Sequence, residues 1–110
     1  MKKAHRVKKG TEIEAILKTR QSVGNSFFVL YKMKNHEQDH YRFAVSVPKK
    51  YGNAVARNKI KRQIREIVMK LDIVPHVDLF LVVKPKANTL SFQDIQELIQ
   101  GLVQKQDILR

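Results

Sequence analysis

The chain has 110 residues, which is enough for one domain and too few for two self-sufficient cores. Hydrophobic residues make up 43% of the sequence and charged residues 29%, a composition that excludes a disordered tail. The sequence contains no cysteine, which excludes disulfides, thiolate metal sites and a cysteine nucleophile. We therefore expect a single folded domain over residues 1–110.

The charge is strongly positive and unevenly distributed. Lysine and arginine number 22 against 10 acidic residues, a net charge of +12. Residues 1–65 carry 17 basic and 4 acidic side chains, whereas residues 66–110 carry 5 and 6. Such a surplus repels itself unless a polyanion binds, so nucleic acid is the leading expected partner. Anionic lipid is the alternative, but the sequence shows neither an apolar run of bilayer length nor an export signal, so we expect no membrane association.

The pattern of apolar residues and turn residues predicts seven elements after a flexible basic arm at 1–10. In chain order these are a helix at 11–20 with a capping box of Thr11 and Glu14, a short extended segment at 22–25, strands at 27–33 and 41–47 joined as a hairpin by a turn at 35–39, a helix at 56–71, a strand at 77–83, and a helix at 91–105 with a capping box of Ser91 and Asp94.

These elements predict an α+β fold. The segment 77–83 is apolar almost throughout, which is typical of a central strand buried on both faces. The segment 41–47 alternates with period two, so Phe43 and Val45 face one side while Arg42 and Ala44 face the other. We expect a two-layer α/β sandwich in the order α-β-β-β-α-β-α, with the helices packed on one face of a small sheet.

The most informative segment lies between positions 49 and 65. Its basic residues are Lys49, Lys50, Arg57, Lys59, Lys61, Arg62 and Arg65. On the helix predicted at 56–71, Asn58, Lys61, Arg62 and Arg65 share an arc opposite an apolar stripe formed by Ile60, Ile64, Ile67 and Leu71. One face of this helix is therefore expected to join the core and the opposite face to carry the cations.

Such a cationic face suits a phosphate backbone. Arginine side chains can donate two hydrogen bonds to phosphate oxygens, and an asparagine such as Asn58 can bond a base edge or a ribose hydroxyl. The alternative is a solvated charged face without a partner. Solvated faces usually mix signs at i,i+4, whereas Glu66 is the only acid between Lys49 and Asp72. This imbalance favours a polyanionic partner.

The segment Ser46–Glu66 also resembles a known family signature. Its order of Lys-Lys-x-Gly-x-Ala-Val followed by Arg-Asn-x-x-Lys-Arg-x-x-Arg is similar to that of the protein subunit of bacterial ribonuclease P. The predicted order of elements over the whole chain is similar to that family too. The resemblance implies a left-handed β-α-β crossover, an exception to the usual handedness.

The resemblance also implies a function. In that family a large RNA with Mg²⁺ removes the 5′ leader from precursor tRNA, and the protein aids substrate binding without catalytic or metal-binding residues. By motif match, the residues expected to contact the catalytic RNA are Arg57, Asn58, Lys61, Arg62, Arg65, Lys49 and Lys50. The resemblance further implies partners limited to ribonuclease P RNA and precursor tRNA, with no obligate protein partner, in the bacterial cytoplasm.

The resemblance also implies a cleft between the first helix and the sheet that holds the single-stranded leader. Val29 and Tyr31 would line its floor, and Ile13 and Leu17 stand on the first helix where the family usually carries aromatic residues. Tyr31 is the candidate for stacking on a base, and its alternative role is a core or strand-edge tyrosine. Ile13 and Leu17 either contact the leader as aliphatic side chains or belong to the core.

Other classes fit less well. A basic ribosomal protein would share the composition and the fold but would not need the extended match at Ser46–Glu66. A DNA-binding helix lacks a second helix in helix-turn-helix spacing. A protein-only nuclease would need a general acid and base, and the four histidines are scattered along the sequence. His36 and His40 flank a predicted turn without a third ligand nearby, so we do not expect a metal site there.

Overall fold

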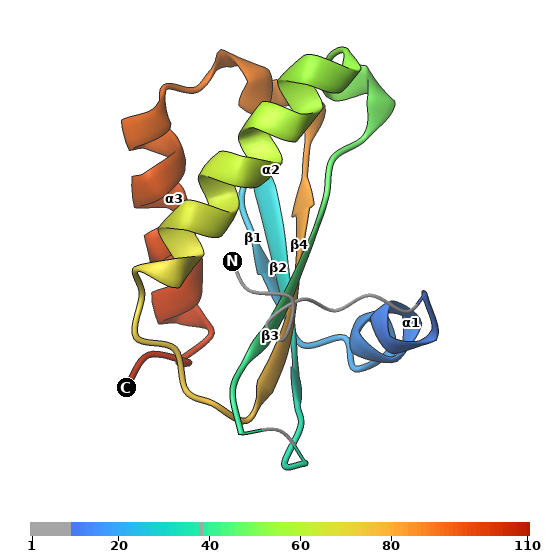
Figure 1. Ribbon diagram of the computed structural model, residues 1–110, viewed down its shortest axis with the longest axis vertical. Coiled ribbons are helices and arrows are strands. Elements are labelled where there is room, and N and C mark those ends of the chain that lie inside the picture. Colours follow the sequence, from blue (N-terminus) through green and yellow to red (C-terminus); the bar gives the residue numbers. More distant parts are fainter. Residues whose placement is uncertain (1–9, 38) are drawn as a thin grey trace.

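The computed structural model describes residues 10–37 and 39–110, so the basic arm expected at 1–10 lies outside them apart from Gly10 (Figure 1). The elements are α1 (Gly10–Lys18), β1 (Ser22–Gly24), β2 (Phe28–Lys34), β3 (Arg42–Ser46), the single-turn 3₁₀ helix η2 (Lys49–Tyr51), α2 (Ala54–Met69), β4 (Val77–Val83), the 3₁₀ helix η3 (Pro85–Thr89) and α3 (Phe92–Lys105). The predicted order of helices and strands is confirmed.

The four strands form one sheet in the order β1-β2-β4-β3. β4 pairs antiparallel with β2 and parallel with β3. The predicted hairpin of 27–33 and 41–47 is therefore wrong, because β4 lies between these two strands. An apolar strand such as β4 is most stable when it is hydrogen-bonded to a neighbour on each side. β2 and β3 are these neighbours, and the loop that connects them crosses the end of β4.

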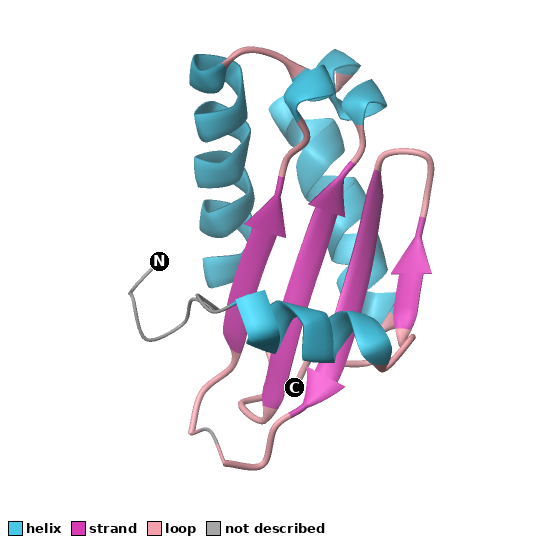
Figure 2. Ribbon diagram, turned by 90° about the vertical axis from the view of Figure 1, so that its right-hand side faces the viewer, coloured by secondary structure: helices cyan, strands magenta, loops and turns pink. Residues whose placement is uncertain are grey.

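The connection from β3 through α2 to β4 has unusual handedness. Figure 2 views the sheet from the side of α1: β3 and β4 both point upward, and β4 lies to the right of β3. α2, at the left edge of this view, lies on the opposite side of the sheet from α1 (Figure 1). This geometry makes the crossover left-handed, as the resemblance implied.

The helices lie on both faces of the sheet, not on one as predicted. α2 and α3 cover one face and α1 covers the other (Figure 1). The reason is the alternation along β4: Leu79 and Leu81 point into the core under α2 and α3, whereas Phe80 and Val82 belong to a smaller cluster with Ile16 of α1. Because both faces of β4 are apolar, both need a covering helix.

Capping residues set the start of two helices. The side chain of Asn53 accepts a hydrogen bond from the N–H of Ala56 at 2.9 Å, so α2 begins two residues before its predicted start at 56. Ser91 and Asp94 form the predicted capping box of α3. The corresponding box predicted at Thr11 is wrong, since α1 already begins at Gly10 and Thr11 lies within it.

Candidate functional site

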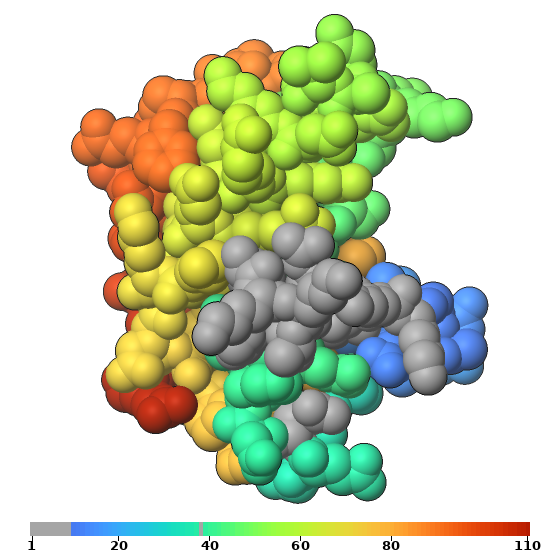
Figure 3. Space-filling view, viewed as in Figure 1, coloured from blue at the N-terminus to red at the C-terminus, as the bar shows by residue number. Residues whose placement is uncertain are grey.

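The outer side of α2 carries the predicted cationic face. Ile60 and Ile64 are almost completely buried on the inner side, which fixes the rotation of the helix about its axis. Asn58 and Arg62 are consequently exposed. Arg57, Lys61 and Arg65 are half-buried along one flank at successive i,i+4 positions. Figure 3 shows α2 running across the surface of this side of the molecule. The predicted separation of apolar and cationic faces is confirmed.

The amino end of α2 adds to the positive potential. Its first turn contains no acidic residue, and its unpaired N–H groups give the helix a partial positive charge at this end. Lys49 and Lys50 lie in η2 just before the Asn53 cap, and both are exposed. Helix dipole and lysines therefore place the same sign of charge together, an arrangement that favours an anion such as phosphate.

Gly52 lies in the link between η2 and α2, close to the first turn of α2. Its φ of 165° is extended backbone that any residue adopts. A Cβ atom at this position would lie 3.2 Å from the Cβ of Ala56, which is tighter than ordinary contact. The glycine therefore allows η2 to sit close to the first turn of α2.

The four residues predicted for the second cleft all lie on the α1 side of the sheet. Val29 and Tyr31 stand opposite Val82 and Phe80 in the pairing of β2 with β4. The rings of Tyr31 and Phe80 are tilted, with centroids 6.3 Å apart. Tyr31 and Ile13 are half-buried and pack against the Ile16–Phe80 cluster, so both contribute to this small core.

The remaining two positions are more accessible. Leu17 of α1 is 37% exposed, and Val29 is half-buried on the sheet. Part of the apolar surface on this side is therefore exposed to solvent.

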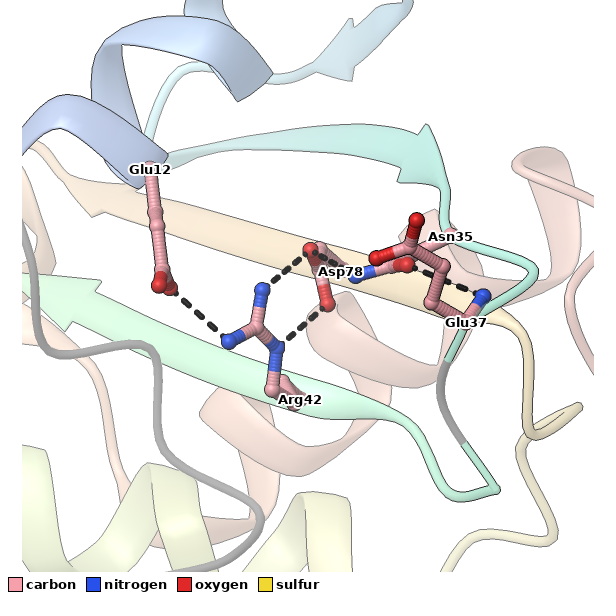
Figure 4. A network of polar contacts seen from close by, with 5 residues as sticks. All are labelled: Glu12, Asn35, Glu37, Arg42 and Asp78. Atoms are coloured by element: carbon pink, nitrogen blue, oxygen red, sulfur yellow. Dashed lines mark hydrogen bonds and ion pairs between the residues drawn. The ribbon is translucent and has the colours of Figure 1, made fainter.

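A polar network that was not predicted from the sequence connects α1 to the sheet (Figure 4). Asp78 of β4 is completely buried. Its carboxylate accepts two hydrogen bonds from Arg42 of β3, at 2.9 Å from Nε and 2.7 Å from Nη2, and a third from Asn35 at 3.0 Å. The guanidinium also pairs with Glu12 of α1, with 2.9 Å between Nη1 and Oε2.

The electrostatics of this network explain its position. The hydrogen bonds to Asp78 raise the pKa of Arg42 above its usual value, with a further contribution from Glu12. A buried carboxylate needs this compensation because an unpaired charge away from water is very costly. The sequence did contain a signal, since Asp78 is a single acid inside the apolar run of β4 and must have a partner.

The described part of the chain contains neither a metal-binding cluster nor a helix that could span a membrane. Within residues 10–37 and 39–110, no three histidine, aspartate or glutamate side chains are grouped so as to hold a metal ion. In the same ranges, no helix combines the length and the apolar character needed to cross a membrane.

The four-stranded sheet, the left-handed crossover and the cationic crossover helix define the class of protein: a basic α+β domain with a surface suited to nucleic acid. Comparison with known proteins specifies the family. The sequence matches the family profile described as Ribonuclease P over residues 1–107. The chain thus belongs to the ribonuclease P protein family, whose members are the protein component of an endoribonuclease of tRNA processing.

Individual relatives agree with this assignment. The ribonuclease P protein component of Levilactobacillus brevis is 42% identical over 98 residues, which cover 86% of this chain and 81% of that protein. The corresponding protein of Acholeplasma laidlawii is 38% identical, covering 99% and 95%. A solved structure of the Staphylococcus aureus RNase P protein superposes with a TM-score of 0.89 at 38% identity, covering 98% of this chain and 100% of that one. The family inferred from Ser46–Glu66 is confirmed.

Proposed function

We propose that this chain binds the RNA subunit of ribonuclease P through the outer face of α2 and holds the single-stranded 5′ leader of precursor tRNA beside α1. The observation that carries the proposal is the single-sign face of α2, formed by Arg57, Asn58, Lys61, Arg62 and Arg65 with Lys49 and Lys50 before it. The family name implies ribonuclease P RNA as the partner. We place this ribonucleoprotein in the bacterial cytoplasm, with no membrane or obligate protein partner.

The face of α2 is suited to binding a folded RNA. Its cationic side chains belong to a helix whose opposite side is packed into the core through Ile60 and Ile64. The spacing of the cations is therefore fixed before RNA binds. Rigid presentation lowers the entropy lost when phosphates are bound. The planar guanidinium groups of Arg62 and Arg65 can each bond two phosphate oxygens, and the exposed Asn58 can recognise a base edge or a 2′-hydroxyl.

The leader is proposed to lie on the opposite face of the sheet. There the accessible Leu17 and Val29, together with the partly exposed Tyr31, offer apolar and aromatic surface for unpaired bases. The Glu12–Arg42 ion pair holds α1 in place beside this surface. A protein with RNA-binding surfaces on both faces of its sheet can contact the RNA subunit and the substrate simultaneously.

The chemistry is assigned to the RNA. The described residues present no cluster of carboxylates that suits Mg²⁺, an ion that prefers several oxygen ligands. In line with the family assignment, we propose that the RNA holds the Mg²⁺ that supports hydrolysis, and that no residue of this chain acts as a general acid, general base or nucleophile.

Reconstitution tests the proposal. The purified chain is combined with a bacterial ribonuclease P RNA, and cleavage of precursor tRNA is measured at low Mg²⁺, with RNA alone and protein alone as controls. We expect efficient cleavage only when both components are present. Cleavage by the protein alone would refute the non-catalytic role, and RNA binding without any gain in cleavage would favour a structural RNA-binding protein of the ribosomal type.

The role of α2 has its own test. Replacing Arg62 with Ala should weaken binding to the RNA subunit and reduce the slope of log affinity against log salt by about one for each lost phosphate contact. Lys105→Ala, at the exposed end of α3, is the matched control for a lost positive charge. Equal slopes for Arg62→Ala and the wild type would contradict a phosphate contact at this position.

A further inference from the structure

A pocket of about 440 Å³ lies outside both surfaces described above, between the first half of α2 and the start of α3. The short helices η2 and η3 complete its wall, and the four segments meet at the top of Figure 1. β3 leads into η2 and β4 leads into η3, so the pocket lies beyond the carboxyl ends of the two parallel strands. In sheets with parallel strands this is the usual position for a ligand.

The lining combines aromatic surface with a few polar groups. Phe92, the first residue of α3, is 41% exposed although its spacing in the sequence fits the apolar stripe of that helix. Tyr51 lies across the pocket in η2. The side-chain amides of Gln63 and Asn88 and the ammonium group of Lys59 also line the pocket. Planar rings with amide donors and acceptors are the groups that bind an unpaired base of RNA.

The pocket is held open by a contact between its walls. The side-chain nitrogen of Asn88 in η3 donates a hydrogen bond to the main-chain oxygen of Tyr51 in η2, at 3.2 Å. The amide oxygen of Asn88 is not used in this bond and is available to a ligand. Pre-formed pockets with a few fixed polar groups are typical of specific ligand sites.

The charge around the pocket favours RNA. Its lining, within the described part of the chain, includes one lysine and no carboxylate. Lys49 and Lys50 stand on η2, and Lys86 stands on η3 beside Asn88; all three are exposed. Asp94, the nearest acid on α3, already accepts a hydrogen bond from the N–H of Ser91 as a helix cap. A base with its flanking phosphates would therefore find donors on several sides.

We propose that this pocket receives a single unpaired base of the RNA subunit, stacked on Phe92 and bonded by the amides of Asn88 and Gln63. The RNA subunit is favoured over precursor tRNA because α2, the helix that carries the cationic residues Lys61 and Arg62, also supplies Lys59 and Gln63 to the pocket, whereas the leader surface lies across the sheet. This inference rests on the proposed function and adds a base-binding pocket next to the cationic face of α2.

The test compares Phe92→Ala with Met69→Ala. Met69 is a matched control because it is an apolar helix residue of similar exposure, 51%, at the far end of α2 from the pocket. Affinity for a bacterial ribonuclease P RNA is measured over a range of salt concentrations. In each complex, with and without precursor tRNA, unpaired adenine and cytosine are probed with dimethyl sulfate, and unpaired uracil and guanine with a carbodiimide. Circular dichroism melting confirms that both variants fold.

The expected result has two parts. Phe92→Ala should bind the RNA subunit about 5- to 100-fold more weakly with an unchanged salt slope, since a stacked base carries no charge of its own. One base of the RNA subunit that the wild type and Met69→Ala protect should also become reactive in the Phe92→Ala complex. Asn88→Ala should expose the same base.

Other results would overturn the inference. Identical affinities and protection patterns for Phe92→Ala and Met69→Ala would exclude a base in the pocket. A newly reactive base in precursor tRNA, with none in the RNA subunit, would assign the pocket to the substrate. Failure of the wild-type chain to bind the RNA subunit would refute the proposed function itself, which distinguishes that failure from failure of the pocket alone.

Discussion

The two faces of the sheet are covered by helices in different ways. Under α2 and α3 the described residues include 18 buried apolar side chains in one continuous core. Under α1 the described residues include two buried members of the apolar cluster, Ile16 and Phe80, and the contact is completed by partly buried residues and by the ion pairs of Arg42. One face therefore provides most of the stability, whereas the other keeps apolar surface accessible and uses charges to position its helix.

This difference affects where ligands can bind. The α2 face has a tightly packed interior, so its binding groups are on the outer side of the helix and beyond the ends of the strands. The α1 face is thinly covered, so the sheet itself is accessible beside the helix. Variants that disturb each face separately can test this division.

The largest effect is expected from Arg42→Met, which leaves the buried carboxylate of Asp78 without its main partner. Removing one side of a buried ion pair typically costs about 3–5 kcal/mol of unfolding free energy. Urea unfolding of Arg42→Met should show this loss. The double variant Arg42→Met with Asp78→Leu removes the orphaned charge and should recover much of the stability. A double variant less stable than Arg42→Met would show that the unpaired charge of Asp78 is not the cause of the lost unfolding free energy.

The two apolar clusters can be compared by truncating an isoleucine in each. Ile64 and Ile16 are both 0% exposed, and Ile→Ala in a core costs about 2–5 kcal/mol, with the higher values where the surroundings cannot relax. We expect Ile64→Ala to lose more unfolding free energy than Ile16→Ala, because the cluster under α1 is small and borders solvent. Equal losses in denaturant unfolding would mean that the two faces are packed equally well.

Tyr31→Ala tests whether the α1 face of the sheet binds the leader. If a leader base stacks on this ring, affinity for precursor tRNA should fall by about 1–3 kcal/mol while affinity for mature tRNA stays the same. Because Tyr31 also packs on Phe80, the thermal stability of the variant is measured alongside. Equal losses for the two tRNAs would assign Tyr31 to folding and not to the leader.

The smallest effect concerns Tyr51 at alkaline pH. Burial raises the pKa of this phenol above its usual value of 10.0, so the folded chain retains the proton more strongly than the unfolded chain. The associated stability is present below pH 10.0 and is lost as the pH rises through the raised pKa. Tyr51→Phe should therefore lose less unfolding free energy than the wild type between about pH 9 and about pH 11. A larger loss in Tyr51→Phe would reverse this assignment.

Local patterns predicted most of the fold. The stripe at Ile60 and Ile64 identified α2, and the apolar run of β4 identified a central strand, because both patterns report burial directly. The strand partners were not predictable in this way. A turn-like link at 35–39 is compatible with a hairpin and with a longer bridge over a third strand, and only the position of β4 decides between them.

The candidate site was predictable to a similar extent. The cationic residues of α2 could be identified because charge and helical period are both visible in the sequence. Contacts between distant residues could not be identified: Glu12, Arg42 and Asp78 are far apart in the chain and meet only after the sheet has formed. Phe92 shows the same limit, since its spacing is that of a core residue and its exposure depends on how α3 packs beside α2.

The central place of β4 has a consequence for synthesis of the protein on the ribosome. β4 spans residues 77–83 and supplies the shared partner of β2 and β3, both of which are made earlier. Until it has left the exit tunnel, β3 has no strand to pair with in this sheet and α2 has only part of its core to pack against. Because the tunnel still covers the most recently added residues, folding of the sheet is postponed until translation has passed well beyond residue 83. A ribosome stalled before this strand would carry a nascent chain whose basic helix is already made but not yet held in place.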